Sequence, residues 1–283
     1  MTGIDRLLDG ARWWWREEVA RRGRGRHRVP AYWFPKANFG DAMSPDLMRH
    51  VLGLKPLPVR SHFPAKLLGT GSIVQRSQPG DVIWGSGLLY PVDIPVEGRT
   101  FLAVRGPRTW SCISGDVPEV YGDPAMLLPR IYRPKRSLRT YELGVVAHYR
   151  DKDVLRTNDP SVLNIDVETY DWRAVVDDIC RCDVIVSSSL HGIIVAESYG
   201  VPAVWVQPTD RIKGGHFKFL DYYEGTGRAS SGPSAWSGRL SRVTASAQAP
   251  PVLDPEPLVR AWWADIGVGA RSPWTDNHET DLR

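Results

Sequence analysis

The sequence predicts an α/β fold in which parallel sheets are covered by helices and the chain forms two halves of similar type. Short apolar runs alternate with stretches of helical periodicity along most of the chain, and glycine or other small residues follow several of these runs directly. This rhythm is typical of strand–turn–helix units, whose strands pair in parallel and are buried on both faces. With 283 residues, 42% of them hydrophobic, the chain is long enough for two domains of ordinary size with packed cores.

The first predicted half covers residues 31–135. A short β-like run at Ala31–Phe34 opens it, and a helix follows for which Ser44 is the expected N-cap, Pro45 the first residue and Gly53 the end. Three more strands are expected, each followed by glycine or small residues: Leu67–Leu68, Val82–Trp84 and Phe101–Val104.

A proline- and arginine-rich linker near Pro129–Thr140 leads to the second predicted half, residues 141–229. The apolar face Trp172, Val175, Val176 and Ile179 predicts one helix of this half, and His191–Tyr199 predicts another that stops at Gly200. The strands expected here are Leu143–Ala147, Val162–Ile165, Val184–Val186 and Ala203–Val206.

The two ends of the chain differ from this pattern. Residues 1–30 predict a basic amphipathic helix followed by a glycine- and arginine-rich stretch. Residues 230–253 are rich in Ser, Ala, Gly and Pro and predict a flexible segment, residues 254–267 a last helix, and residues 268–283 a frayed tail.

The net charge of +4 comes entirely from the arm at residues 1–30, which holds eight arginines against four acidic residues. The rest of the chain is neutral, so its body has no electrostatic footprint for nucleic acid. For the arm we favour a helix docked on its own protein, and the alternative is a helix lying on an anionic membrane surface.

Other classes of protein are excluded by what the sequence lacks. No apolar run approaches the ~20 residues needed to cross a bilayer, and the N-terminus has no secretory signal pattern. Three cysteines cannot make a disulfide framework, and Cys180 and Cys182 are too few and too close for a zinc site. We therefore expect a reduced, cytoplasmic setting and no metal. The glycine clusters match neither the dinucleotide-binding nor the P-loop spacing.

The strongest candidate site follows the apolar strand Val184–Val186. Ser187, Ser188 and Ser189 come next, and His191 with Gly192 opens a helix. Ligands of parallel α/β sheets bind beyond the carboxyl ends of strands, and the free N–H groups at a helix N-terminus attract anions. A histidine there can exchange protons with a bound phosphate or carboxylate. The structural alternative is a helix cap beside a core histidine.

Three weaker signals accompany it. Asn38, Gly40 and Asp41 lie at a similar strand–helix junction, where the aspartate can act as a base, although an ordinary Asx turn explains the same pattern. Arg105 ends another strand and can bind a carboxylate or phosphate, and Lys218 follows the last strong strand. Each cation is otherwise an ordinary surface charge.

These segments together resemble the polysaccharide pyruvyl transferase family, and are most similar to its exopolysaccharide ketal-pyruvate transferase branch. The matching stretches keep their order along the chain: Ala31–Gly53, Val82–Leu88, Ala103–Thr109, Tyr121–Leu128, Cys182–Val206 and Phe217–Arg228. The block around His191-Gly192 is the most specific, and the block around Asn38–Asp41 is second. Many members have arginine where this chain has Ser189.

The resemblance implies two Rossmann-like lobes with a cleft between them, as in GT-B glycosyltransferases. It also implies transfer of pyruvate from phosphoenolpyruvate to two hydroxyls of a sugar or lipid-linked oligosaccharide, without a cofactor. His191 is then the general acid/base, and Asp41 orients or deprotonates the acceptor hydroxyl. Ser188, Ser189, Gly192, Arg105 and Lys218 bind the donor, and Asn38 and Gly40 bind the acceptor.

With Ser189 in place of the family's arginine, the donor's negative charge has to be met by Arg105, Arg150, Arg211 or Lys218. Two alternatives stay open. One is a nucleotide-sugar glycosyltransferase of the same architecture. The other is a non-catalytic component of a polysaccharide assembly complex, held at the inner face of the membrane by the arm.

Overall fold

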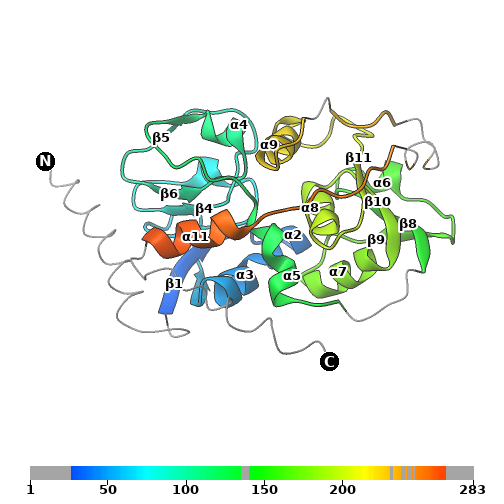
Figure 1. The fold of residues 1–283 in the computed structure, drawn as a ribbon, viewed down its shortest axis with the longest axis horizontal. Helices are drawn as coiled ribbons and strands as arrows, with labels where there is room; N and C mark the ends of the chain where they lie inside the picture. The colour runs from blue at the N-terminus through cyan, green and yellow to red at the C-terminus, as the bar shows by residue number, and fades with distance from the viewer. Residues whose placement is uncertain are drawn as a thin grey trace, which may run out of the picture.

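The computed structural model describes residues 27–134, 140–229, 232–236, 240, 244 and 246–265. Two parallel sheets stand side by side in it (Figure 1). The first has the strand order β2 (Leu54–Pro58), β1 (His27–Tyr32), β3 (Leu67–Leu68), β4 (Val82–Trp84), β6 (Thr100–Ala103). The second has the order β11 (Ala203–Trp205), β10 (Cys182–Ser187), β8 (Tyr141–Val146), β9 (Val162–Ile165). The predicted α/β class with parallel sheets is confirmed, and the side-by-side sheets are consistent with a two-lobed arrangement.

The first strand is longer than the sequence suggested. It begins at His27 instead of Ala31, because it pairs along its length with β2, from His27 opposite Leu54 to Ala31 opposite Pro58. The sequence of β2, Leu-Lys-Pro-Leu-Pro, contains two prolines, which hid it from a search for apolar runs. A small separate sheet joins β5 (Ile94–Pro95) to β7 (Ile113–Ser114).

The first helical region consists of two helices where one was expected. A short helix, α2 (Phe39–Ala42), is capped by the side chain of Asn38, and α3 (Ser44–Val51) follows with Met43 as its N-cap. The prediction that Ser44 caps this helix is wrong. Its hydroxyl is hydrogen-bonded to that of Thr70 and is not available to a backbone N–H.

In the second half, α7 (Trp172–Cys180) buries the predicted apolar face against the sheet, and α8 (Leu190–Ser198) follows β10. Helix α8 begins one residue before the predicted His191, with Ser189 as its N-cap residue. The remaining short helices are η1 (Val74–Arg76), α4 (Pro107–Trp110), η2 (Pro124–Leu127), α5 (Leu128–Ile131) and α6 (Lys152–Leu155).

The two halves share one hydrophobic core. The largest cluster of buried apolar residues includes Phe39 from the first half and Trp172 and Ile193 from the second. Phe39 N–H donates to the Val167 carbonyl over 3.0 Å, and Trp172 Nε1 donates to Asp46 Oδ2 over 3.1 Å. These contacts fix how the carboxyl ends of the two sheets face each other.

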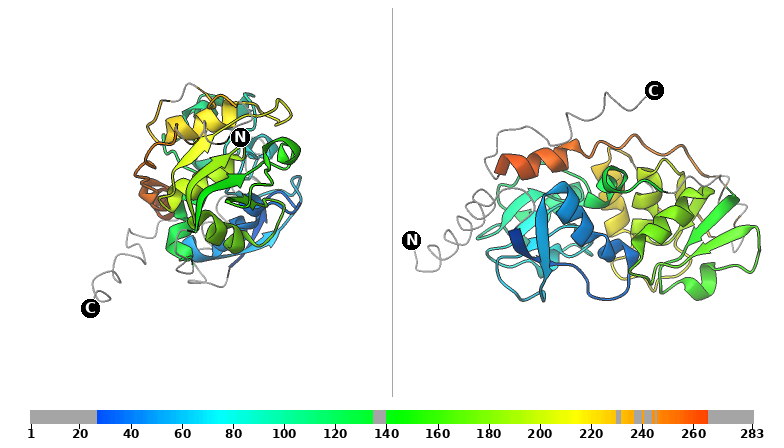
Figure 2. Two further views of the ribbon diagram at one scale, coloured as in Figure 1. Left: turned by 90° about the vertical axis from the view of Figure 1, so that its right-hand side faces the viewer. Right: turned by 90° about the horizontal axis from the view of Figure 1, so that it is seen from below.

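Two later helices pack back on the first half (Figures 1 and 2). Helix α9 (Phe217–Gly225) lies against α4, and Arg108 forms a two-bonded ion pair with Glu224 there. Helix α11 (Glu256–Asp265) packs on β6, and Trp84 Nε1 donates to the Leu258 carbonyl over 2.9 Å. The chain therefore crosses between the halves more than once.

Several predictions fall where the structure gives no description. Most of the basic arm at residues 1–30, the tail at 268–283 and parts of the segment 230–253 lie outside the described residues. Within the described part of the chain, no helix has the length and apolar character required to cross a membrane.

Candidate functional site

A small pocket lies at the carboxyl ends of strands from both sheets. Its volume is about 190 Å³. It is lined by the segments that follow β1, β3, β4, β8 and β10 and by one side chain of α9: Phe34, Asn38, Asp41, Gly71, Ser72, Ile73, Gln75, Arg76, Leu89, His148, Ser189, Leu190, His191 and Lys218. This is the place where parallel α/β sheets bind ligands. Five of the predicted site residues line it: Asn38, Asp41, Ser189, His191 and Lys218.

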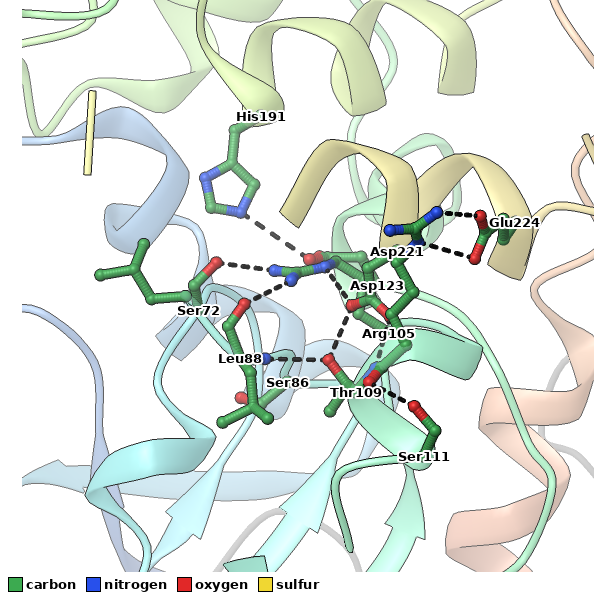
Figure 3. A network of polar contacts seen from close by, with 12 residues as sticks. Ser72, Ser86, Leu88, Arg105, Thr109, Ser111, Asp123, His191, Asp221 and Glu224 are labelled. Atoms are coloured by element: carbon green, nitrogen blue, oxygen red, sulfur yellow. Dashed lines mark hydrogen bonds and ion pairs between the residues drawn. The ribbon is translucent and has the colours of Figure 1, made fainter. Parts of the chain in front are cut away.

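The His191 ring extends from the first turn of α8 toward Asp123 (Figure 3). Its Nε2 lies 3.9 Å from Asp123 Oδ2, and the side chain is 13% exposed. Burial, followed by the positive charges of Arg105 and Lys218, lowers the pKa of His191 to about 3. The ring is therefore neutral at pH 7.

Gly40 makes room for this ring. A Cβ atom at position 40 would lie 1.9 Å from His191 Nδ1, so any side chain there would displace the imidazole. Asn38 holds the glycine in place, because its Oδ1 accepts a hydrogen bond of 2.9 Å from Gly40 N–H. The Asx-type cap that the sequence offered as an alternative is therefore present, and it also shapes the site.

Asp41 lies beside the histidine and is only 7% exposed. Burial raises its pKa from 3.8 to about 7, and the charge of Asp123 adds to the rise. A hydrogen bond from the Phe34 backbone and the charge of Lys218 oppose it. Asp41 is thus a carboxyl group that carries a proton for about half of the time at neutral pH.

Lys218 reaches the pocket from α9 and is 8% exposed. Burial, with the charge of Arg105, lowers its pKa to about 8, and Asp41 and Asp151 partly compensate. Among the described residues, no hydrogen bond or ion pair satisfies its ammonium group. The ammonium lies 5.3 Å from the centre of the Phe219 ring, so among these residues its contact is an aromatic face and not a carboxylate.

Arg105 lies beneath the pocket and has no exposed surface. Its Nε donates to Asp221 Oδ2, its Nη1 to Ser72 Oγ, and its Nη2 to the Leu88 carbonyl (Figure 3). Because all three nitrogens already donate within the protein, the structure does not support direct contact between Arg105 and a donor. Arg105 instead fixes the position of Ser72, which does line the pocket.

Two other predicted donor-binding residues also shape the site without lining it. Ser188 Oγ accepts a hydrogen bond of 3.0 Å from the backbone of His148. A Cβ at Gly192 would lie 2.5 Å from Ser187 Oγ, so this glycine lets α8 pack closely on β8 and β10.

The two arginines considered as substitutes for the missing family arginine lie elsewhere. Arg150 donates to the Arg211 carbonyl, and Arg211 is paired with Asp153. Neither residue lines the pocket.

The structure adds two polar residues that the sequence search missed, and a third, Asp123, for which the sequence favoured a turn over a catalytic role. Arg76 lies on η1 and is exposed at the pocket, and His148 lines it directly after β8. Asp123 is completely buried behind His191. The strand-end rule applied to His191 also applies to His148, whereas Arg76 follows no strand. Asp123 with Pro124 ends a strand-like segment in the sequence, which favours a turn. In the structure Asp123 follows a single bridge between Val104 and Tyr121 and caps η2.

Three comparisons place this geometry among known proteins. Residues 96–210 match the family described as polysaccharide pyruvyl transferase. An uncharacterized protein of Acanthamoeba polyphaga mimivirus is 34% identical over 163 residues, 54% of this chain and 57% of that protein. A solved structure of an uncharacterized protein from Klebsiella pneumoniae has 14% identity and a TM-score of 0.40, covering 79% of this chain and 94% of that one.

The family expected from the sequence is the one that matches residues 96–210, and the description of that family names a transferase. The matched stretch holds Arg105, Asp123, His148, Ser189 and His191. Asp41 and Lys218 lie outside it, although they line the same pocket. The chain spans 57% of the length of the curated relative that it matches.

Proposed function

We propose that this chain, which matches the polysaccharide pyruvyl transferase family over residues 96–210, moves pyruvate from phosphoenolpyruvate to two hydroxyls of a sugar residue and forms a cyclic ketal. The observation that carries the proposal is the Lys218 ammonium, which has no hydrogen bond or ion pair among the described residues, beside two proton-exchanging groups, Asp41 and His191, in one small pocket. The acceptor is a sugar or lipid-linked oligosaccharide in the synthesis of exopolysaccharide or another cell-surface glycan.

The pocket suits a small, strongly anionic donor. Its volume of about 190 Å³ is below the ~300–1,000 Å³ of pockets that bury drug-sized ligands. Lys218 and Arg76 supply positive charge for the phosphate and the carboxylate of phosphoenolpyruvate. The free N–H groups of α8, which begins at the Ser189 cap, add to this. These groups take the place of the arginine that many family members have at position 189.

The proton inventory of the site fits ketal formation. The two acceptor hydroxyls each lose a proton, the methylene carbon of the donor gains one to become a methyl group, and the departing phosphate takes the other. Asp41 holds a proton near neutral pH and serves as the acid for the methylene carbon. His191 is neutral and serves as the base for the attacking hydroxyl. Electron density from the double bond goes to the new C–H bond as the first acceptor oxygen attaches to the same carbon that bears the phosphate. The C–O bond to phosphate then breaks, and the second acceptor oxygen takes its place and closes the ring.

Ligand binding separates this proposal from the nucleotide-sugar alternative. We expect phosphoenolpyruvate to raise the melting temperature of the full chain, and UDP- and GDP-sugars to leave it unchanged. Lys218→Met should abolish the shift, whereas Lys213→Met, which removes an exposed lysine five residues earlier, should keep it. Stabilisation by a nucleotide sugar and not by phosphoenolpyruvate would favour the glycosyltransferase.

Turnover tests the catalytic assignment. Phosphate release from phosphoenolpyruvate should require an acceptor, supplied as a panel of free and lipid-linked oligosaccharides. His191→Ala should lower the rate by about 10²–10⁴-fold, the usual loss when acid–base assistance is removed. An undiminished rate in this variant refutes the role of His191.

A further inference from the structure

Two buried polar atoms near the pocket face each other without a hydrogen bond. They are His191 Nε2 and Asp123 Oδ2, which lie 3.9 Å apart (Figure 3). Within the described residues, neither atom has any hydrogen-bond partner. A buried donor or acceptor left unsatisfied costs about 1–3 kcal/mol, so this arrangement requires an explanation.

The Asp123 carboxylate is held firmly from its own side. Its Oδ1 accepts from Ala125 N–H over 3.0 Å and caps η2, which leaves Oδ2 directed at the histidine. The following Pro124 packs closely on Gly85, where a Cβ would lie 2.5 Å from the proline ring. Asp123 is fully buried, and burial raises its pKa to about 6, while backbone hydrogen bonds from Ala125 and Gly71 and the charge of Arg105 oppose the rise. It is therefore mostly ionised at neutral pH.

The imidazole is held from the other side. Phe39 meets it edge-on with ring centroids 6.4 Å apart, and Gly40 lies against Nδ1. Because Nε2 is buried, the 13% exposure of the side chain belongs to its other atoms, and His191 lines the pocket. A shift of about 1 Å brings Nε2 and Oδ2 to ordinary hydrogen-bond distance.

We propose that Asp123 is a positioning residue for His191: its Oδ2 accepts the Nε2–H hydrogen bond and thereby leaves Nδ1 as the basic nitrogen on the pocket side. Asp123 fixes the tautomer and stabilises the imidazolium that forms when Nδ1 takes a proton, and it stays ionised itself. The identity of the group that gives up this proton, an acceptor hydroxyl, rests on the proposed function. The pairing of Asp123 with His191 does not.

The tautomer of His191 is the direct test. In the full chain labelled with ¹⁵N-histidine, the His191 signals, identified by their loss in His191→Gln, should show the Nε2–H form. Asp123→Asn keeps an oxygen to cap η2 and turns an NH₂ group toward Nε2, so the ring should switch to the Nδ1–H form. Asp171→Asn is the control, because Asp171 also caps a helix with its side chain, accepting from Ala174 N–H at the start of α7, and does not line the pocket; it should change nothing.

An Nδ1–H tautomer in the wild-type chain, or the same tautomer in wild type and Asp123→Asn, overturns the proposal. The wild-type spectrum decides the question by itself if the variant does not fold. These spectra need no substrate, so they remain valid if the chain uses another donor. Failure of phosphoenolpyruvate to bind or react would overturn the proposed function alone.

Turnover provides a second readout. Asp123→Asn should lower kcat by about 10²–10⁴-fold and leave KM for phosphoenolpyruvate unchanged, because the residue acts through His191 and touches no substrate. The acidic limb of the pH–rate profile should also move, since the basic nitrogen has changed. Retention of wild-type kcat and pH profile in Asp123→Asn contradicts the positioning role.

Discussion

Replacing Asp41 by Asn should stabilise the protein at neutral and alkaline pH while it abolishes turnover. The folded chain holds the Asp41 carboxyl at a pKa of about 7, against an ordinary value of 3.8, chiefly because the group is buried. Between pH 3.8 and about pH 7, the Asp41 carboxyl holds a proton in the folded state and has released it in the unfolded state. Stability therefore falls as the pH rises through this window, and the loss is complete above pH 7. Asparagine has the same shape and no charge to bury.

The size of the effect follows from the two pKa values. At about 1.36 kcal/mol for each tenfold change in proton affinity, the rise from 3.8 to about 7 corresponds to about 4 kcal/mol. Asp41 lines an open pocket from which water can reach it, so we take half of this, about 2 kcal/mol. For a chain of this size that corresponds to about 4–8 °C in melting temperature.

Melting curves of the wild type and Asp41→Asn at several values between pH 4 and pH 9 measure the effect. The variant should melt higher at pH 8, and the difference should disappear toward pH 4, where the wild-type carboxyl is also neutral. Asp116→Asn, which changes an exposed aspartate, should melt like the wild type throughout. A difference that is equally large at pH 4 would mean that packing and not charge is responsible, and the absence of any difference at pH 8 would refute the reasoning.

Three further predictions concern the groups around this carboxyl. Gly40→Ala should lower turnover about 10²-fold with the fold retained, because the new Cβ displaces the His191 ring; comparing kcat with the melting temperature checks this. Asp221→Asn should cost about 3–5 kcal/mol in urea unfolding, since it leaves the buried Arg105 without its ion partner. The lowered pKa of His191 means that stability falls as the pH drops from about 6.5 toward 3, so His191→Gln should recover about 2 kcal/mol at pH 5, measured by urea unfolding at pH 5 and pH 8.

The site residues that directly follow a strand with a clear apolar run could be predicted from the sequence. The apolar run before Ser189 and His191 marks a buried strand, and the loop containing Asp41 stands in the same relation to β1. In a parallel sheet the carboxyl ends lie at one edge, so local patterns are sufficient to bring these loops together. His148 satisfies the same rule, since it follows β8 and lines the pocket.

The role of Arg105 could not be predicted in this way. The sequence shows a cation at the end of a strand, which is compatible with ligand binding. What decides its role is Asp221, 116 residues further along the chain, whose carboxylate accepts from Arg105 and from Thr109. Pairings at such separation leave no periodic signal, and neither does the approach of Asp123 to His191.

The buried pairing of Arg105 with Asp221 also explains how Lys218 reaches a pocket formed largely by other segments. Lys218 and Asp221 are three residues apart on α9 and therefore share one face of that helix. Arg105 and Thr109 hold Asp221 against the first half, which directs the lysine into the pocket. Arg105 thus fixes the helix that carries Lys218, so in the proposed function it would support anion binding without touching the anion. The matched family stretch ends at residue 210, so it contains Arg105 but not Lys218. The complete site therefore forms only when the folded chain brings these two residues together.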